Sequence, residues 1–294
     1  MSNLQTLCGV ENTIFQAGMG GIAGPELTAA VSNAGGLGHL GGIRMAAEDI
    51  RSWIKETRSL TDNPFGINLV PMGPGPNGFE AQLSVVLEEK PKVLSLFWGD
   101  FSSVIPRAKA AGISTMVQVG SVKDAKKAAQ DGADIIIAQG IEAGGHVRGN
   151  IGVMALLPAI IKAVGPVPVL AAGGIATSEG VKAAMKLGAQ GVWVGTSFVA
   201  TPESLAHDIY KQRLVEAGTD DTVHGHFYSY GWPVGTPYRV ILPKKKGIHQ
   251  FVSGGAKRID SPQKASGLKV YAGQGVGQID QILPAAGVLA KLGA

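Results

Sequence analysis

The clearest candidate for chemistry in this sequence is one histidine in a glycine-flanked loop. His146 lies in the segment QGIEAGGHVRG, residues 139–149, directly after two glycines. An apolar run at 134–138 precedes the segment, so we expect the loop at the end of a strand. An imidazole, with its ordinary pKa of about 6.5, transfers protons well near neutral pH. We therefore take His146 as the candidate catalytic residue, against the alternative of a structural or exposed histidine.

Glycines after two later apolar runs form a candidate phosphate site. The segments are VPVLAAGGIATSEG at 167–180 and GVWVGTSFVATPES at 191–204. The backbone amides of Gly173, Gly174, Gly195 and Thr196 are expected at neighbouring strand ends, where glycine lets the main chain approach a phosphate. The alternative is that both segments are only tight turns between strand and helix.

Two polar residues end apolar runs and need partners. Asn68 lies in FGINLV, and Gln118 lies in MVQVG. A buried amide at a strand end requires a hydrogen-bond partner, which is either a ligand or a neighbouring loop.

Two further motifs carry less information. GLGHLG at 36–41 matches the dinucleotide pattern, but it follows a helical segment and contains the expected strand, so we interpret it as a glycine-rich strand near a ligand. His224 and His226 could bind a metal ion, but no third ligand is evident nearby, and we expect no metal site.

These residues need a scaffold, and the pattern of the chain predicts one. Short apolar runs alternate with helical patterns over roughly the first 200 residues, as in an α/β protein with buried parallel strands. The expected strands are 13–17, 36–40, 65–70, 93–97, 114–119, 134–138, 167–171 and 191–194. Eight such units predict a (β/α)8 TIM barrel, and a doubly wound sheet is the rival fold. Glycines after many of the strands favour the barrel, because all its strand ends meet at one face.

Helices are expected between the strands. Ser121 and Thr177 are predicted N-caps, and Pro158 weakens the helical pattern of its segment. The expected helices are 25–33, 47–60, 122–130, 152–164, 178–187, 205–217 and 279–291.

The pattern changes after residue 201. Residues 218–277 are rich in Gly, Pro, Tyr and Lys, and we expect them to wrap the barrel or cap its mouth. The predicted domain organisation is a barrel at 1–217 and a C-terminal extension at 218–294 that packs on it without being an independent domain.

Composition excludes several classes of protein. With 45% hydrophobic and 16% charged residues the chain is not a disordered protein, and 43 glycines without a three-residue period exclude collagen. A net charge of +4 without a basic block gives no reason to expect nucleic acid. Cys8 is the only cysteine, and we find no signal peptide or membrane span, so a cytoplasmic protein is expected.

The motifs together resemble a known family. FQAGMGG, FGINL, QGIEAGGH, VLAAGGIA and GVWVGTSF occur in this order between about residue 12 and residue 204. They resemble the nitronate monooxygenases, formerly called 2-nitropropane dioxygenases. They are also similar to the flavin-dependent enoyl-acyl-carrier-protein reductases and NAD(P)H:quinone reductases of the same superfamily.

The resemblance implies a barrel that holds non-covalent FMN. It implies that Ala17, Gly18 and Met19 line the flavin ring, and that Asn68, Gln118 and Gln139 hydrogen-bond to the ring or the ribityl chain. Gly144 and Gly145 are expected to pack against the cofactor. The resemblance implies that the phosphate is held by Gly174 and the amides of Trp193, Val194, Gly195 and Thr196, next to the candidate Gly173.

The resemblance gives His146 a place beside the reactive face of the flavin. There it would act as a general base toward a nitroalkane, or as a hydrogen-bonding group for an anionic substrate. One departure is Gly18, where relatives more often have proline; this loosens the loop and keeps its backbone donors.

The expected reaction is oxidation of an alkyl nitronate by O2 to a carbonyl compound and nitrite. The first alternative is a reductase that uses NAD(P)H to reduce a quinone or an enoyl thioester. The second is a flavin-binding protein without catalysis. The substrate and the number of subunits, including a homo-oligomer, stay open.

Overall fold

The computed structural model describes residues 3–71, 78–226, 232, 235–242 and 269–293. Parts of the predicted extension, at 227–231, 233–234 and 243–268, lie outside the described residues.

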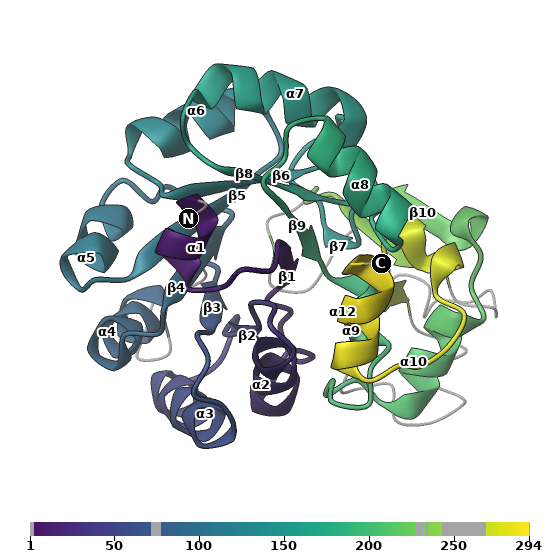
Figure 1. Cartoon of the computed structure of the whole chain (residues 1–294), viewed down its shortest axis with the longest axis horizontal. Coiled ribbons are helices and arrows are strands. Elements are labelled where there is room, and N and C mark those ends of the chain that lie inside the picture. Colours follow the sequence, from purple (N-terminus) through teal and green to yellow (C-terminus); the bar gives the residue numbers. More distant parts are fainter. Residues whose placement is uncertain (1–2, 72–77, 227–231, 233–234, 243–268, 294) are drawn as a thin grey trace.

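Eight parallel strands form the centre of the molecule, with helices around them (Figure 1). The strands are β1 (Ile14–Gln16), β2 (His39–Gly41), β3 (Gly66–Leu69), β4 (Val93–Phe97), β5 (Ser114–Val119), β6 (Ile135–Gln139), β8 (Val169–Ala172) and β9 (Gly191–Val194). Their order in the sheet, β1-β9-β8-β6-β5-β4-β3-β2, confirms the predicted TIM barrel and excludes the doubly wound sheet.

The seam between β1 and β2 closes the barrel. One parallel bridge joins Phe15 to Leu37, and Gln16 N–H donates to the Leu37 carbonyl at 3.0 Å. The fully buried Gln16 side chain extends the seam: its Nε2 donates to the His39 carbonyl at 3.1 Å, and its Oε1 accepts from His39 N–H at 2.8 Å. A side-chain amide thus takes the place of a ladder pair that the short strands do not make.

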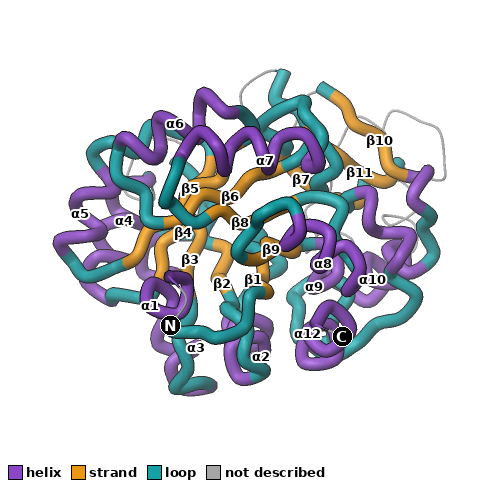
Figure 2. Tube along the Cα trace, turned by 45° about the horizontal axis from the view of Figure 1, so that its top comes forward, coloured by secondary structure: helices purple, strands orange, loops and turns teal. Residues whose placement is uncertain are grey.

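Helices cover the outside of the barrel, as the tilted view also shows (Figure 2). They are α2 (Pro25–Asn33), α3 (Ala47–Leu60), α4 (Phe79–Glu89), α5 (Val104–Ala110), α6 (Val122–Gln130), α7 (Val153–Val164) and α8 (Ser178–Lys186). The predicted caps are confirmed: Ser121 Oγ accepts from Asp124 N–H, and Thr177 Oγ1 accepts from Gly180 N–H. Pro158 lies within α7 on its exposed side, where a missing N–H costs least.

The C-terminal part returns to the barrel. It contains α9 (Thr196–Val199), α10 (Asp208–Val215), the 3-10 turns η1 (Thr219–Asp221) and η4 (Gln274–Gln278), and α12 (Ala285–Gly293). The last helix, α12, contacts α2, α8 and β1 (Figure 1), and its Val288 and Leu289 belong to the core between strands and helices. It therefore fills a place in the ring of helices, although its sequence lies in the predicted extension.

A second, smaller sheet stands beside the barrel. Its strands are β10 (Thr222–Gly225), β11 (Tyr238–Ile241), β12 (Val270–Tyr271) and β7 (Gly145–His146). β11 pairs with the other three, all antiparallel. Because β7 belongs to the loop after β6, this sheet ties the barrel to the extension.

Several elements differ from the expectation. Four α-helices were not predicted: α1 (Asn3–Cys8), which packs with the side chains inside the barrel, the short or weakly patterned α4 and α5, and the single turn α9. β2 begins at His39 rather than residue 36, because Gly38 packs so closely on α2 that a Cβ there would overlap the Thr28 carbonyl. In the part of the chain that the structure describes, no helix is long and apolar enough to span a membrane.

We predict that Gln16→Leu destabilises the barrel strongly. The change removes both hydrogen bonds to His39 and leaves its buried N–H and C=O without their partners, at about 1–3 kcal/mol for each group. Urea unfolding should show this loss in the free energy of unfolding. Gln190→Leu, at an exposed side chain, is the control and should stay within about 0.5 kcal/mol of the wild type. Equal losses in both variants would contradict the role of the seam.

Candidate active site

A cavity of about 490 Å³ opens at the carboxyl ends of the barrel strands. The volume lies within the range of about 300–1,000 Å³ that is usual for small-molecule sites. Every site residue predicted from the sequence lines this cavity: Ala17, Gly18, Met19, Asn68, Gln118, Gln139, Gly144, Gly145, His146, Gly173, Gly174, Trp193, Val194, Gly195 and Thr196. The structure thus brings together residues from almost the whole length of the barrel.

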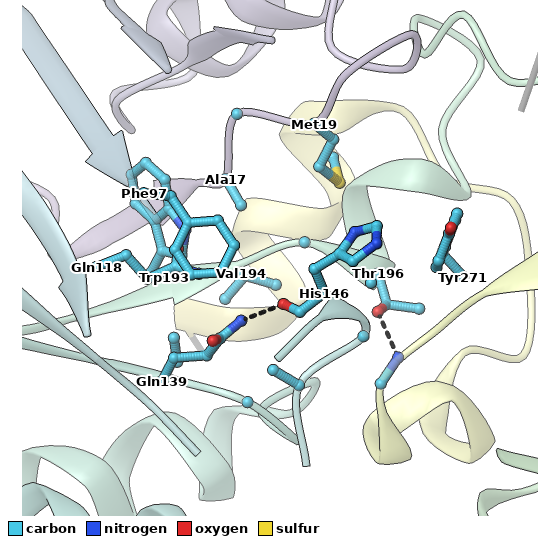
Figure 3. Close-up of a pocket in the computed structure, with 18 of the residues that line it drawn as sticks. Ala17, Met19, Phe97, Gln118, Gln139, His146, Trp193, Val194, Thr196 and Tyr271 are labelled. Carbon is cyan, nitrogen blue, oxygen red and sulfur yellow. Dashed lines mark hydrogen bonds between the residues drawn. The ribbon is translucent and has the colours of Figure 1, made fainter. Parts of the chain in front are cut away.

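Glycines crowd one corner of the cavity. Gly173 and Gly174, after β8, have φ angles of +110° and +72°, which disfavour any residue with a side chain. Thr196, after β9, accepts a hydrogen bond from Gly273 N–H through Oγ1 at 3.0 Å (Figure 3). A Cβ on Gly275 would come within 2.7 Å of the Gly174 carbonyl. The corner is therefore built from three backbone segments that only glycine-rich sequence lets approach one another.

Two amide side chains face the same cavity with unused groups. Gln118 makes no side-chain hydrogen bond to any residue that the structure describes. Asn68 Nδ2 donates to the Ser95 carbonyl and hydroxyl at 3.2 and 3.1 Å, and its Oδ1 accepts no bond from the described residues. Both side chains can therefore hydrogen-bond a polar ligand.

Gln139 serves the loop that carries His146. Its Nε2 donates to the His146 carbonyl at 2.9 Å (Figure 3), and its Oε1 accepts from Arg148 N–H at 2.8 Å. Both polar atoms of the Gln139 side chain thus have backbone partners in the loop. These two hydrogen bonds fix the loop that carries His146 to the end of β6. The expected contact from Gln139 to a flavin stays a prediction.

The C-terminal extension forms one wall around His146. Tyr238 of β11 pairs with His146 of β7, and Val147 N–H donates to the Pro237 carbonyl at 2.9 Å. The Trp232 ring stacks on the imidazole, with centroids 3.8 Å apart and planes 17° apart. The centroid of the Tyr271 ring, on β12, lies 5.6 Å from the centroid of the imidazole. The position of the imidazole is therefore fixed by residues far along the chain.

Burial makes His146 a neutral group. Removal from water, and next the positive charge of Arg44, lower the pKa of His146 to about 3. At neutral pH the ring carries one N–H donor and one nitrogen acceptor. It can donate a hydrogen bond to an anion, and as a proton acceptor it is weak.

Some lining residues escaped the sequence analysis. Arg44, Trp232, Tyr271, Gly273 and Gly275 all line the cavity. The YAGQG segment at 271–275 carried a signal, since its two glycines are separated by one residue, and glycines also mark the predicted phosphate loops. Arg44 follows the end of β2 by three residues and Trp232 lies in the segment YGWP, but neither side chain was assigned to the site from the sequence.

The two histidines at 224 and 226 do lie together. His224 is on β10, and the centroids of the two rings are 5.1 Å apart. Among the residues that the structure describes, no group of three or more His, Cys, Asp or Glu side chains is arranged to hold a metal ion.

Known proteins share this sequence and architecture. The sequence model of the family described as nitronate monooxygenase matches residues 1–77 and 72–241. The chain is 34% identical to a nitronate monooxygenase of Pseudomonas aeruginosa, over 97% of this chain and 96% of that protein.

Two other similarities broaden the group. The chain is 38% identical to the (3aS,4S,5R,7aS)-5-hydroxy-7a-methyl-1-oxo-octahydro-1H-indene-4-carboxyl-CoA dehydrogenase of Rhodococcus jostii, over 82% of this chain and 67% of that protein. A solved structure of a FabK mutant from Thermotoga maritima superposes with a TM-score of 0.89 at 33% identity, covering 99% of this chain and 95% of that one.

These relatives include oxidoreductases with different named substrates. They set aside the interpretation of a binding protein without catalysis. The chain belongs to the nitronate monooxygenase family, a family of flavin-dependent oxidoreductases, and is an oxidoreductase itself.

Proposed function

We propose that this protein is an FMN-dependent nitronate monooxygenase, which oxidises alkyl nitronates with O2 to carbonyl compounds and nitrite. The observation that carries the proposal is the cavity at the strand ends, which joins a glycine-lined corner to the neutral His146 side chain. The match to the family model and the nitronate monooxygenase from Pseudomonas aeruginosa support it.

The glycine-lined corner suits the phosphate of FMN. Glycines at the ends of β8 and β9 line this corner, and a Cβ on Gly275 would come within 2.7 Å of the Gly174 carbonyl oxygen. In TIM barrels a phosphate commonly binds after the last two strands. We assign Gly174, Gly195 and Thr196 to this contact.

The opposite side of the cavity suits the flavin ring. Gln118 offers an unused amide, and Asn68 offers an unused carbonyl oxygen. Figure 3 shows Gln118, Phe97 and Trp193 together at one side of the pocket, and Thr196 and Tyr271 at the other. An isoalloxazine ring presents both donors and acceptors along one edge, which such amides can satisfy.

His146 is assigned to the substrate. Its neutral ring donates a hydrogen bond to a nitronate oxygen, and the Trp232 stack together with the Gln139 bond keeps the ring in place. FMN, when bound, supplies the redox chemistry by taking electrons from the substrate and passing them to O2. Because a base with a pKa of about 3 is weak, we assign His146 to hydrogen bonding of the anion rather than to deprotonation of neutral nitroalkanes.

A second candidate function is reduction of a quinone or an enoyl thioester with NAD(P)H. It is favoured by the similarity to a CoA dehydrogenase and to FabK. The aromatic wall of Phe97, Trp232 and Tyr271 also suits a planar substrate or nicotinamide ring.

Anaerobic reduction of the bound flavin separates the two functions. We expect ethyl nitronate to bleach the visible flavin absorbance of the purified FMN-loaded protein in a single reductive half-reaction, and NADH or NADPH to leave it largely oxidised. Release of nitrite on admitting O2 is the second readout. Bleaching by NAD(P)H alone would contradict the nitronate proposal and favour the reductase.

Replacement of His146 tests its role toward the substrate. His146→Ala should lower kcat/KM for ethyl nitronate about 10–100-fold, the size of a lost hydrogen bond to a charged group. His146→Gln, which keeps an N–H donor, should retain more activity, and both variants should keep their FMN. Because the lowered pKa keeps His146 neutral above about pH 3, kcat/KM should not fall through protonation of this residue between pH 8 and pH 5. A titration near pH 6.5 that disappears in His146→Ala would show that this account of the pKa is wrong.

The support that Gln139 gives to the loop can be tested separately. Gln139→Met has a similar volume and loses both hydrogen bonds, to the His146 carbonyl and the Arg148 N–H. We expect a loss of kcat/KM close to that of His146→Ala, with the free energy of unfolding lowered by about 1–3 kcal/mol. Unchanged kinetics would mean that β7 alone positions the histidine.

A further inference from the structure

A tight turn after β2 reaches the rim of the cavity. Met45 N–H donates to the Gly42 carbonyl at 3.3 Å, which closes a turn over residues 42–45. The Gln82 side chain, 3% exposed, fastens the same turn from beneath, because its Nε2 donates to the carbonyls of Gly42 and Met45 at 3.2 and 2.7 Å. Gly42 N–H in turn donates to the Asn68 carbonyl at 2.9 Å. The turn is therefore rigidly held against β3 and α4.

The third residue of this turn is Arg44, in an unfavourable backbone conformation. Its φ is +60°, a value that glycine or asparagine usually takes at this position of a turn. Only three residues other than glycine have a positive φ among those that the structure describes. Strain of this kind persists where the surrounding bonds enforce it, and it is common at ligand sites. An arginine with a φ angle that favours glycine thus indicates that the side chain has a function at the cavity.

The charge of Arg44 acts on the substrate side of the cavity. Arg44 lines the cavity from an exposed position at its rim, and its positive charge lowers the pKa of His146. Among the described lining residues it is the only lysine or arginine, and no aspartate or glutamate is present. Among these lining residues Arg44 therefore supplies the charge that favours an anion beside the imidazole.

We propose that Arg44 is the residue that recognises the negative charge of the substrate, a small planar anion with two equivalent oxygens such as a nitronate or a carboxylate. The guanidinium supplies a parallel pair of donors that match two such oxygens. His146 supplies the neighbouring neutral donor. This inference rests on the proposed function, which places the substrate beside His146. It adds the side chain that selects an anionic over an uncharged substrate.

Binding of an unreactive anion tests the assignment without turnover. Propionate has the shape and charge of ethyl nitronate, and propionamide has the shape without the charge. Each is titrated into the FMN-loaded protein, and its dissociation constant is read from the change in the visible flavin spectrum. Arg44→Gln and Arg44→Gly should weaken propionate binding at least tenfold and leave FMN and propionamide affinity unchanged. Arg44→Lys should keep propionate within a few-fold of the wild type.

Two controls separate charge recognition from damage to the fold. Arg107→Gln removes an exposed arginine that pairs with Glu80 outside the cavity and should change no dissociation constant. Arg44→Gly should melt no lower than the wild type, because glycine accepts the positive φ without strain. Loss of propionate binding in a protein of undiminished stability is the result that supports the proposal.

A titration of His146 tests the same geometry in the protein without flavin. Removing the positive charge in Arg44→Gln favours the imidazolium, so the pKa of His146 measured by NMR should rise. An unchanged pKa would overturn the placement of the Arg44 charge at the substrate.

The outcomes of the binding experiment distinguish this inference from the proposed function. Propionate binding that depends on Arg44 supports the anion site even if nitronates do not reduce the flavin. Equal propionate affinity in Arg44→Gln and the wild type, or no propionate binding at all, overturns it. Coenzyme A that competes in an Arg44-dependent way while propionate does not would also overturn it, because the arginine would then recognise a phosphate on the tail of a larger substrate.

Discussion

Closure of the parallel sheet is the constraint on which the rest of this structure depends. Only when β1 meets β2 do all eight strand ends face a common cavity. The seam has one backbone bridge, between Phe15 and Leu37, and the buried amide of Gln16 supplies the remaining bonds to His39. The loop with Met19 follows β1, and the turn with Arg44 follows β2. The seam therefore sets the positions of both segments at the mouth of the cavity.

The second organising feature is the sharing of the candidate active site between the barrel and the C-terminal part. His146 belongs to a barrel loop, yet its strand pairs with β11 and its ring stacks on Trp232. The glycine corner is likewise completed by Gly273 and Gly275. The described part of the extension thus forms part of the candidate site, and α12 is part of the barrel core. The division of the chain at residue 217 stays a prediction, because residues on either side of it pair with one another in the structure.

The sequence predicted much of the barrel because its signals are local. Apolar runs such as ADIIIA mark the buried strands, and Ser121 and Thr177 mark helix starts through bonds to residues three positions away. The glycine loops and His146 were found because they directly follow such strands. Arg44, Trp232 and Tyr271 were not assigned to the cavity because their places in it come from contacts between distant segments, and the glycines of YAGQG were the only local signal among them. The low pKa of His146 was likewise beyond the sequence, because burial and the nearby charge produce it.

The most direct test of the account is a crystal structure of the protein with FMN and propionate bound. The account predicts the phosphate within hydrogen-bond distance of the backbone amides at Gly174 and Thr196, the flavin ring beside Gln118, and the carboxylate between Arg44 and His146. A flavin bound elsewhere, or in the opposite direction with its phosphate near Gln118, would contradict it.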